Sequence, residues 1–133
     1  METIFWKDSF NTLGQTIMRL EEVINHQDVD KNEYMQDASI QRFEFVAELF
    51  WKVLKKILAY EKIDCTTPRE VFKKAFQFCL INDEELWLQI LDDRNNTSHV
   101  YKQEDAKRVF KNIKTYLPIF VETYSNIKSR YNL

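Results

Sequence analysis

Glycine, proline, cysteine and histidine are all scarce in this 133-residue chain, which has one Gly, two Pro, two Cys and two His. Glycine-rich phosphate loops and dinucleotide-binding turns need glycine at fixed backbone positions, so P-loop and Rossmann folds are excluded. Tight β-hairpins need it too, so small β-barrels are also excluded. The most common nucleotide-binding architectures therefore do not apply to this sequence.

Patterns for metal binding and membrane insertion are also missing. Cys65 and Cys79 form no CxxC pair, and with only two histidines the chain lacks the ligands of a structural zinc site. No segment approaches about 18 uncharged apolar residues, and the start METIFWKDSF is unlike a signal peptide. We therefore expect a cytoplasmic protein with reduced cysteines, no membrane anchor, no metal and no other cofactor.

The residues that are present fit one globular domain. Hydrophobic residues make up 44% of the chain and charged residues 30%, which suffices for a core and a solvated surface. The net charge is −2, so contact with nucleic acid would need a local basic patch rather than an overall positive field. No repeat, low-complexity tract or linker interrupts the chain, and we expect residues 1–133 to form a single domain.

Apolar residues recur with helical spacing along the chain, and no stretch shows sustained strand alternation. This spacing predicts three long and two short helices, at about residues 4–27, 34–60, 67–80, 82–96 and 104–131. The expected fold is all-α, an antiparallel up-down bundle of four to five helices. Pro118 is expected to kink the last helix.

Two of the helix starts carry capping signals. Thr67 as N-cap, Pro68 at the first helical position and Glu70 at the third form a capping box. Asn82 with Glu85 three residues later is expected to repeat the device.

The second long helix has an unusually broad apolar face. Phe45, Leu49 and Val53 widen it beyond what one neighbouring helix needs. This breadth implies either a central position in the bundle or a subunit interface.

The chemically informative segment is DDRNNTSHVY, residues 92–101. Arg94 lies four residues after Ile90, so its guanidinium falls on the apolar stripe of its helix. A charge at that position is expected to be paired or to line a cleft. Alternatively, Arg94 reaches solvent at the helix end or bridges to Asp92 or Asp93.

His99 follows five residues after Arg94. On an unbroken helix it would lie about 140° around the axis from Arg94. Bringing the two together therefore needs a chain bend, which the polar run at residues 95–98 favours. A group that titrates near neutral pH beside a fixed cation suits metal-free phosphodiester cleavage. The alternative is a hydrogen-bonded structural histidine.

Basic residues on several helices offer either an RNA-binding rim or ordinary solvated helix faces. They are Lys52, Lys55, Lys56, Lys73, Lys74, Lys107, Arg108, Lys111 and Lys114. Trp51 and Trp87 lie beside apolar stripes, which favours packing over base stacking.

Four blocks of the sequence resemble the nucleotidyltransferase substrate-binding protein family, the HEPN-type helical partners of minimal nucleotidyltransferases. The blocks are RFEFVAELFWKVLK (42–55), TPREVFKKAFQFCLI (67–81), DEELWLQILDDRNNTSHVY (83–101) and YLPIF (116–120). They occur in the family's order and cover over half the chain. Within them, Arg94, Asn95 and His99 match the HEPN signature. Tyr101 extends it to the form found in HEPN toxins paired with nucleotidyltransferase antitoxins.

The resemblance implies a HEPN-like bundle that forms a homodimer and brings two such loops to one cleft. It also implies metal-independent endoribonuclease activity in active members. His99 would take part in proton transfer involving the RNA 2′-hydroxyl or the leaving oxygen. Arg94 would bind the scissile phosphate. Asn95 would orient these groups, and Asp92 or Asp93 would hold Arg94.

The expected function is therefore that of a toxin in a toxin–antitoxin pair, with RNA as its substrate and a cognate minimal nucleotidyltransferase as its partner. The partner would neutralise it by adenylylating Tyr101 (AMPylation), because a bulky anionic nucleotide there would compete with RNA. Two alternatives are a non-catalytic substrate-binding subunit of a two-component nucleotidyltransferase and a structural helical adaptor. The chain lacks the Gly-Ser motif and paired aspartates of a nucleotidyltransferase, so it should not transfer nucleotides itself.

Overall fold

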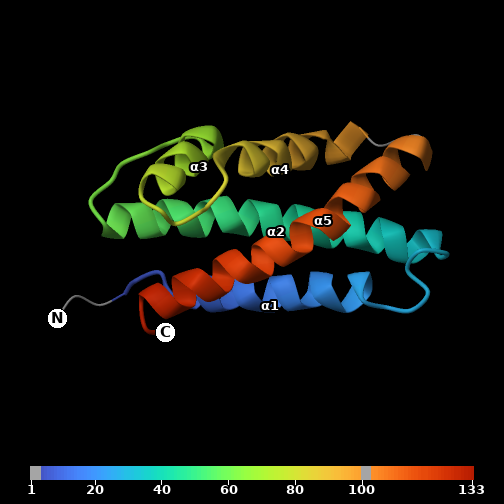
Figure 1. Ribbon diagram of the computed structural model, residues 1–133, viewed down its shortest axis with the longest axis horizontal. Helices are drawn as coiled ribbons and strands as arrows, with labels where there is room; N and C mark the ends of the chain where they lie inside the picture. Colours follow the sequence, from blue (N-terminus) through green and yellow to red (C-terminus); the bar gives the residue numbers. More distant parts are fainter. Residues whose placement is uncertain (1–3, 100–102) are drawn as a thin grey trace.

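The computed structural model describes residues 4–99 and 103–133, and these residues form helices joined by turns and short connections (Figure 1). No β-strand occurs within these two ranges. The five α-helices are α1 (Lys7–Ile24), α2 (Glu33–Tyr60), α3 (Pro68–Gln77), α4 (Glu84–Asn96) and α5 (Gln103–Arg130). A short 3-10 helix, η1 (Thr97–His99), directly follows α4. The predicted all-α fold is confirmed.

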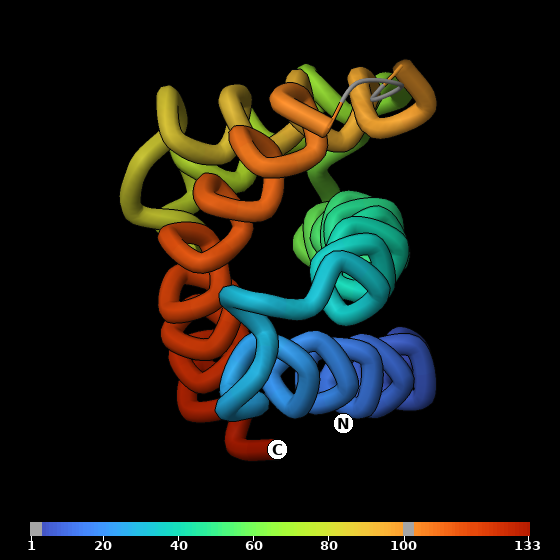
Figure 2. The backbone as a smooth tube through the Cα atoms, turned by 90° about the vertical axis from the view of Figure 1, so that its right-hand side faces the viewer, coloured from blue at the N-terminus to red at the C-terminus, as the bar shows by residue number. Residues whose placement is uncertain are grey.

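The central helix is α2, which contacts each of the other four. Figure 1 shows α1 on one side of α2, α3 and α4 on the opposite side, and α5 crossing obliquely toward α1. The chain reverses direction between α1 and α2 and again between α4 and α5, which confirms the antiparallel bundle. Figure 2 shows that, within the described residues, no helix covers the side of α2 that faces away from α5.

The apolar stripes predicted from the sequence meet in one core. At its centre, Phe50 of α2 lies between Trp87 of α4 and Phe120 of α5, with ring centroids 4.8 Å and 5.6 Å away. Aromatic pairs at such distances contribute about 0.5–1.5 kcal/mol beyond the burial of their surface. The packing role expected for Trp87 is confirmed, since only 1% of this residue is exposed.

The broad apolar face of α2 serves its central position. Val53 is buried in the core, whereas Leu49 is half-buried and Phe45 is 50% exposed. The part of the face that carries Phe45 and Leu49 therefore lies on the uncovered side of α2.

The only glycine in the chain lies where α1 and α5 approach closely. A Cβ atom on Gly14 would lie 2.7 Å from Cζ of Tyr124, well inside van der Waals contact. The Tyr124 ring stacks on Phe10 with centroids 4.1 Å apart and planes 5° from parallel. Glycine is required here because a larger residue would displace the Tyr124 ring.

The cap predicted for α3 is confirmed, and the cap predicted for α4 was wrong by one residue. Thr67 Oγ1 accepts a hydrogen bond from the backbone N–H of Glu70 at 3.2 Å. The N-cap of α4 is Asp83 rather than Asn82, and its carboxylate accepts the backbone N–H of Leu86 at 3.0 Å. A carboxylate at this position also interacts favourably with the helix dipole.

Helix α5 continues through Pro118. Figure 2 shows its axis bending part-way along, as expected where proline removes one helical hydrogen bond and crowds the preceding turn. The second half of α5 packs against α1, where Tyr124 stacks on Phe10.

No described helix is both long enough and apolar enough to cross a bilayer. The described residues also contain no group of three or more His, Cys, Asp and Glu side chains placed to hold a metal ion. Both cysteines are free thiols.

Candidate functional site

The segment singled out by the sequence forms the end of α4 and the 3-10 helix η1. Helix α4 ends at Asn96, as predicted, and the chain continues directly into Thr97–His99. Thr97 is buried, and its Oγ1 donates a hydrogen bond to the backbone carbonyl of Arg94 at 2.7 Å. The backbone N–H of Thr97 donates to the same carbonyl, so two hydrogen bonds close the end of α4.

Arg94 points from α4 toward α2. Its Nη2 lies 3.1 Å from Oε2 of Glu48, and 35% of its side chain is exposed. Its Nε is buried and has no hydrogen-bond partner among the described residues. The prediction that a guanidinium on this apolar stripe must be paired is confirmed. The exposed part of the group remains available to an anion from solvent.

Glu48 is the residue that sequence reasoning missed. Oε2 of Glu48 also accepts a hydrogen bond from Nε1 of Trp51 at 3.0 Å, and Oε1 lies 3.2 Å from Nζ of Lys52. Burial alone would raise the pKa of the Glu48 carboxyl. Hydrogen bonds from Trp51 and Lys52, and the charges of Arg94 and Lys52, instead lower it below its ordinary value. Glu48 is therefore an ionised carboxylate at neutral pH.

The carboxylates expected to hold Arg94 bind other residues instead. Asp92 pairs with Arg69 of α3, with Oδ1 and Nη2 3.1 Å apart on an exposed surface. Asp93 is only 8% exposed and points toward α5. Its Oδ2 accepts hydrogen bonds from the Tyr116 hydroxyl at 2.6 Å and from Nδ2 of Asn112 at 3.1 Å. Arg94 faces α2, so its guanidinium pairs with Glu48 of that helix instead.

The pair formed by Asp93 and Tyr116 ties the end of α4 to α5. Burial of the hydroxyl, together with the hydrogen bond and charge of Asp93, raises the pKa of Tyr116 far above its ordinary value. Tyr116 therefore keeps its proton throughout the physiological range, and its hydroxyl donates a hydrogen bond to the buried carboxylate. Because Asp93 directly precedes Arg94, this contact fixes the backbone from which Arg94 projects.

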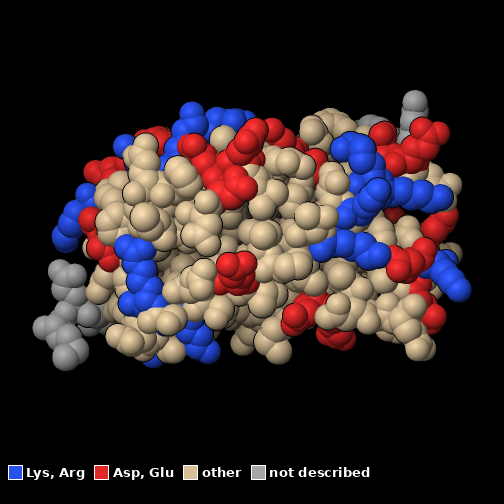
Figure 3. Space-filling view, in the orientation of Figure 1, with Lys and Arg blue, Asp and Glu red and all other residues tan. Residues whose placement is uncertain are grey.

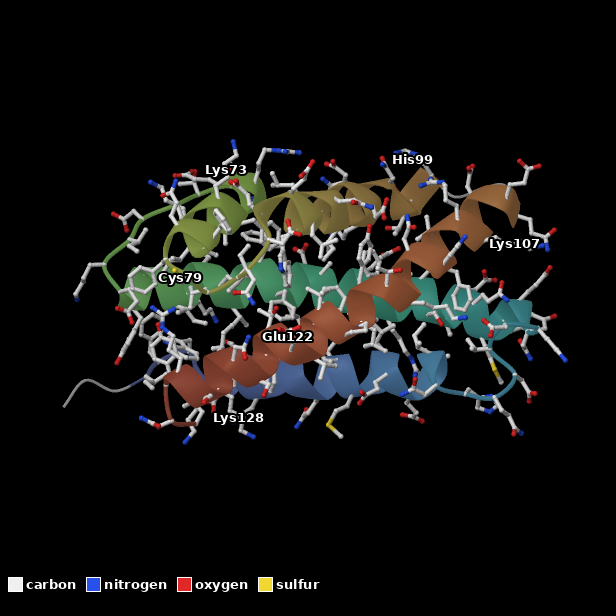
Figure 4. The ribbon with its side chains drawn as sticks, viewed as in Figure 1. Lys73, Cys79, His99, Lys107, Glu122 and Lys128 are labelled. Carbon is white, nitrogen blue, oxygen red and sulfur yellow. The ribbon has the colours of Figure 1, made fainter. Side chains whose placement is uncertain are left out.

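His99 and Asn95 are both exposed, and Figure 4 shows His99 at the outer edge of the molecule beside the end of α4. An α-helix turns about 100° per residue and a 3-10 helix about 120°. With these ideal turns, position 99 falls about 180° around the axis from position 94. That Arg94 and His99 meet at one site stays a prediction. Tyr101 lies outside the described residues.

Comparison with known proteins agrees with this fold. The model of the family described as nucleotidyltransferase substrate binding protein like matches residues 8–129. The chain belongs to this family. Within curated proteins, the chain is 33% identical over 118 residues to a Haemophilus influenzae protein named probable ribonuclease HepT, with 82% of this chain and 80% of that protein covered.

Solved structures show the same helical fold. A Thermus thermophilus protein matches with a TM-score of 0.80 and 28% identity, covering 87% of this chain and 98% of its own. A Haemophilus influenzae protein is described as having the fold of a substrate-binding domain of a nucleotidyltransferase. It matches with a TM-score of 0.68 and 28% identity, covering 92% of this chain and 96% of its own. A tri-AMPylated Shewanella oneidensis HEPN toxin, solved in complex with its MNT antitoxin, shares the fold at 19% identity with a TM-score of 0.75, covering 97% and 99%. The predicted HEPN-like architecture of this family member is confirmed.

Proposed function

We propose that this family member is the HEPN-type partner of a minimal nucleotidyltransferase and acts as the toxin of a toxin–antitoxin pair. Its activity is that of a metal-independent endoribonuclease, which adenylylation of Tyr101 neutralises. The observation that carries the proposal is the partly exposed Arg94, held by Glu48 at the end of α4 one short turn before an exposed histidine. The names of the Haemophilus ribonuclease and of the Shewanella toxin–antitoxin complex support it.

In the proposed reaction, the RNA 2′-oxygen attacks the adjacent phosphorus and the bond to the 5′-oxygen breaks. The products carry a 2′,3′-cyclic phosphate and a 5′-hydroxyl. His99 takes the proton from the 2′-hydroxyl or gives one to the leaving oxygen. Arg94 binds the phosphate oxygens, whose negative charge grows in the transition state. Asn95, exposed between the two, orients the substrate.

The ideal turns of α4 and η1 put positions 94 and 99 on opposite sides of the helix end, and this favours a site shared by two chains. We propose a homodimer in which Arg94 of one copy and His99 of the other act on the same phosphate. The part of the uncovered side of α2 around Phe45, which is half exposed and lies in the N-terminal half of the helix, offers apolar surface for that contact. A closed two-fold dimer would contain two such sites.

The test of the activity is incubation of the purified chain with total RNA in EDTA. The unmodified protein should leave cyclic-phosphate ends, and Arg94→Ala and His99→Ala should each lower the rate by about 100-fold or more. Mixing the two inactive variants should restore about a quarter of the wild-type activity if the site is shared between subunits. No restoration, or a monomeric mass at micromolar concentration, would contradict the shared site.

The proposed modification has a separate test. Incubation with the partner nucleotidyltransferase and ATP should add AMP to the wild-type chain and stop RNA cleavage. Tyr101→Phe should remain unmodified and active under the same conditions. If Tyr101→Phe still accepts AMP, the assignment of Tyr101 is wrong.

A second function is favoured by the family description and by the Haemophilus substrate-binding domain. In it, the chain is a non-catalytic subunit that binds the substrate of the nucleotidyltransferase. No RNA cleavage by folded, unmodified protein, together with a stable complex with the nucleotidyltransferase, would support this function over the ribonuclease.

A further inference from the structure

A groove of about 450 Å³ runs beside the C-terminal half of α2. Its walls include Phe5 and Ser9 from the N-terminal part of the chain and Trp51, Lys52, Lys55 and Lys56 from α2. The volume lies within the range of about 300–1,000 Å³ typical of binding sites. We call this cavity the α2 groove.

Two aromatic side chains flank the α2 groove. Phe5 is 60% exposed, although its ring also lies 6.3 Å from that of Tyr60. Trp51 is half-buried, and its orientation is fixed by the hydrogen bond from Nε1 to Glu48. Trp51 packs against the core with part of its ring, and its remaining surface and the Phe5 ring face the groove. Aromatic rings can stack on nucleobases without distinguishing among them, because every base has a π-face.

Three lysines line the α2 groove, and its positive charge comes from Lys55 and Lys56, because Lys52 pairs with Glu48. Lys52, Lys55 and Lys56 are exposed, and the described residues that line the groove include no carboxylate. Lys56 donates a hydrogen bond from Nζ to Oγ of Ser9 at 2.7 Å, which holds its ammonium at the wall. Lys52 reaches Glu48 at 3.2 Å, and Glu48 in turn holds Arg94 at 3.1 Å. A chain of charged contacts therefore connects the groove to Arg94.

The other basic surface is less suited to a polyanion. Figure 3 shows lysine and arginine gathered over the first half of α5, with acidic side chains among them. Lys114 pairs with Asp30, and the first turn of α5 carries Glu104 and Asp105. These carboxylates compensate the α5 cations, so this surface offers a polyanion less net charge than the α2 groove.

We propose that the α2 groove binds single-stranded RNA next to the cleavage site. The lysines contact successive phosphates, and Phe5 and Trp51 stack on bases exposed by the single strand. The inference rests on the proposed ribonuclease function, and it adds where the substrate lies and why it is single-stranded. A duplex keeps its bases stacked internally and cannot present them to the two rings.

The test is RNA binding in a His99→Ala background, where cleavage does not consume the probe. A fluorescent single-stranded RNA oligonucleotide is titrated at several salt concentrations and followed by anisotropy. Lys55→Gln with Lys56→Gln should weaken binding about tenfold and lower the salt slope by about 1.4, since each single-strand phosphate contact contributes about 0.7. Phe5→Ser should weaken binding roughly tenfold without changing the slope, because it removes stacking and not charge.

The matched control is Lys73→Gln with Lys74→Gln, the same pair of residues on α3. Figure 4 shows Lys73 pointing outward from α3, away from α2. This variant should bind the RNA as tightly as the background protein. Lys52 is left unchanged because its loss would disturb Glu48 and Arg94.

The outcomes separate this proposal from the ribonuclease proposal. If the wild-type chain cleaves RNA and both lysine variants have the same KM and the same RNA affinity, the α2 groove proposal is overturned while the activity stands. If the α2 lysine variant alone loses RNA affinity but the wild-type chain does not cleave, the groove stands and the ribonuclease fails. Unchanged RNA affinity with weakened binding of the nucleotidyltransferase would make the groove a protein contact and overturn the proposal.

Discussion

Neighbouring residues at the end of α4 have separate roles because the helix directs them to different partners. Asp93 is buried against α5 and accepts two hydrogen bonds, whereas Arg94 faces α2 and pairs with Glu48. Burial of a carboxylate or a guanidinium is tolerated only with such partners. Single substitutions can therefore test the contribution of each side chain to stability or to RNA cleavage.

Glu48→Gln tests whether the carboxylate positions Arg94. The amide keeps the shape but loses the charge that holds the guanidinium, so we expect RNA cleavage to slow by about tenfold with little change in KM. Single-turnover kinetics would measure this. Glu44→Gln, one turn earlier on α2, serves as control. Equal rates for the two variants would show that Glu48 does not position Arg94.

Tyr116→Phe removes one donor from a buried carboxylate. Among the described residues, Asn112 then remains as a donor to Asp93, and we expect the free energy of unfolding to fall by about 1–3 kcal/mol. Urea denaturation at neutral pH would measure the change. An unchanged midpoint would mean that the hydroxyl contributes nothing to the attachment of α4 to α5.

The same variant should alter the pH dependence of stability. An unfolded tyrosine ionises near pH 10, whereas burial and Asp93 keep Tyr116 protonated above that pH in the folded chain. Its stabilisation is complete below about pH 10 and is lost as the pH rises further. Burial and Glu61 raise the pKa of Tyr131 in the same direction. Denaturation midpoints should therefore fall less steeply above pH 10 in Tyr116→Phe than in wild type, and a parallel fall would contradict the assignment.

At the scale of elements, sequence spacing predicted all five α-helices and the bounds of α2 and α5 to within one residue. Helix α1 is three residues shorter at each end than predicted, and α3 ends three residues earlier. The start of α3 depends on local chemistry that the sequence displays, namely Thr67 before Pro68. At the start of α4, two consecutive residues, Asn82 and Asp83, can both cap a helix. In the folded chain Asp83 accepts the N–H of Leu86, and the local sequence pattern does not distinguish the two candidates.

The corrected cap gives a direct comparison of two adjacent residues. Asp83→Ala removes the acceptor of the Leu86 N–H and should lower the free energy of unfolding by about 1 kcal/mol. Asn82→Ala should change it by less than about half as much. Urea denaturation midpoints of the two variants would measure this difference. A larger loss of stability for Asn82→Ala would show that Asn82 is the N-cap.

At the scale of the whole molecule, the bundle was predictable and the geometry of the site was only partly so. The stripes identify which faces are buried, and the sequence placed Arg94 and His99 in one short segment. The partner of Arg94 was missed because Glu48 is 46 positions away in the sequence and meets it only when α4 packs on α2. Spacing along one helix cannot report a contact between two helices.

That residues 1–133 form a single domain stays a prediction, and unfolding tests it. The core joins residues from all five helices, so we expect one cooperative transition. Far-ultraviolet circular dichroism and tryptophan fluorescence should give the same midpoint, and a dimer would make that midpoint depend on protein concentration. Separate transitions for the two signals would indicate more than one folding unit.

The position of α2 within the bundle determines which of its residues can be substituted without loss of folding. Four helices surround α2 and leave one strip of it uncovered. Because an α-helix repeats every 3.6 residues, adjacent positions such as Lys52 and Val53 are under opposite constraints. Substitutions at exposed positions of the strip can alter which molecules bind without affecting folding. Substitutions at the buried positions beside them would disturb the core. New binding specificity can therefore arise on this helix at the exposed positions of each turn, such as Lys52, Lys55 and Lys56, and not at the buried positions between them.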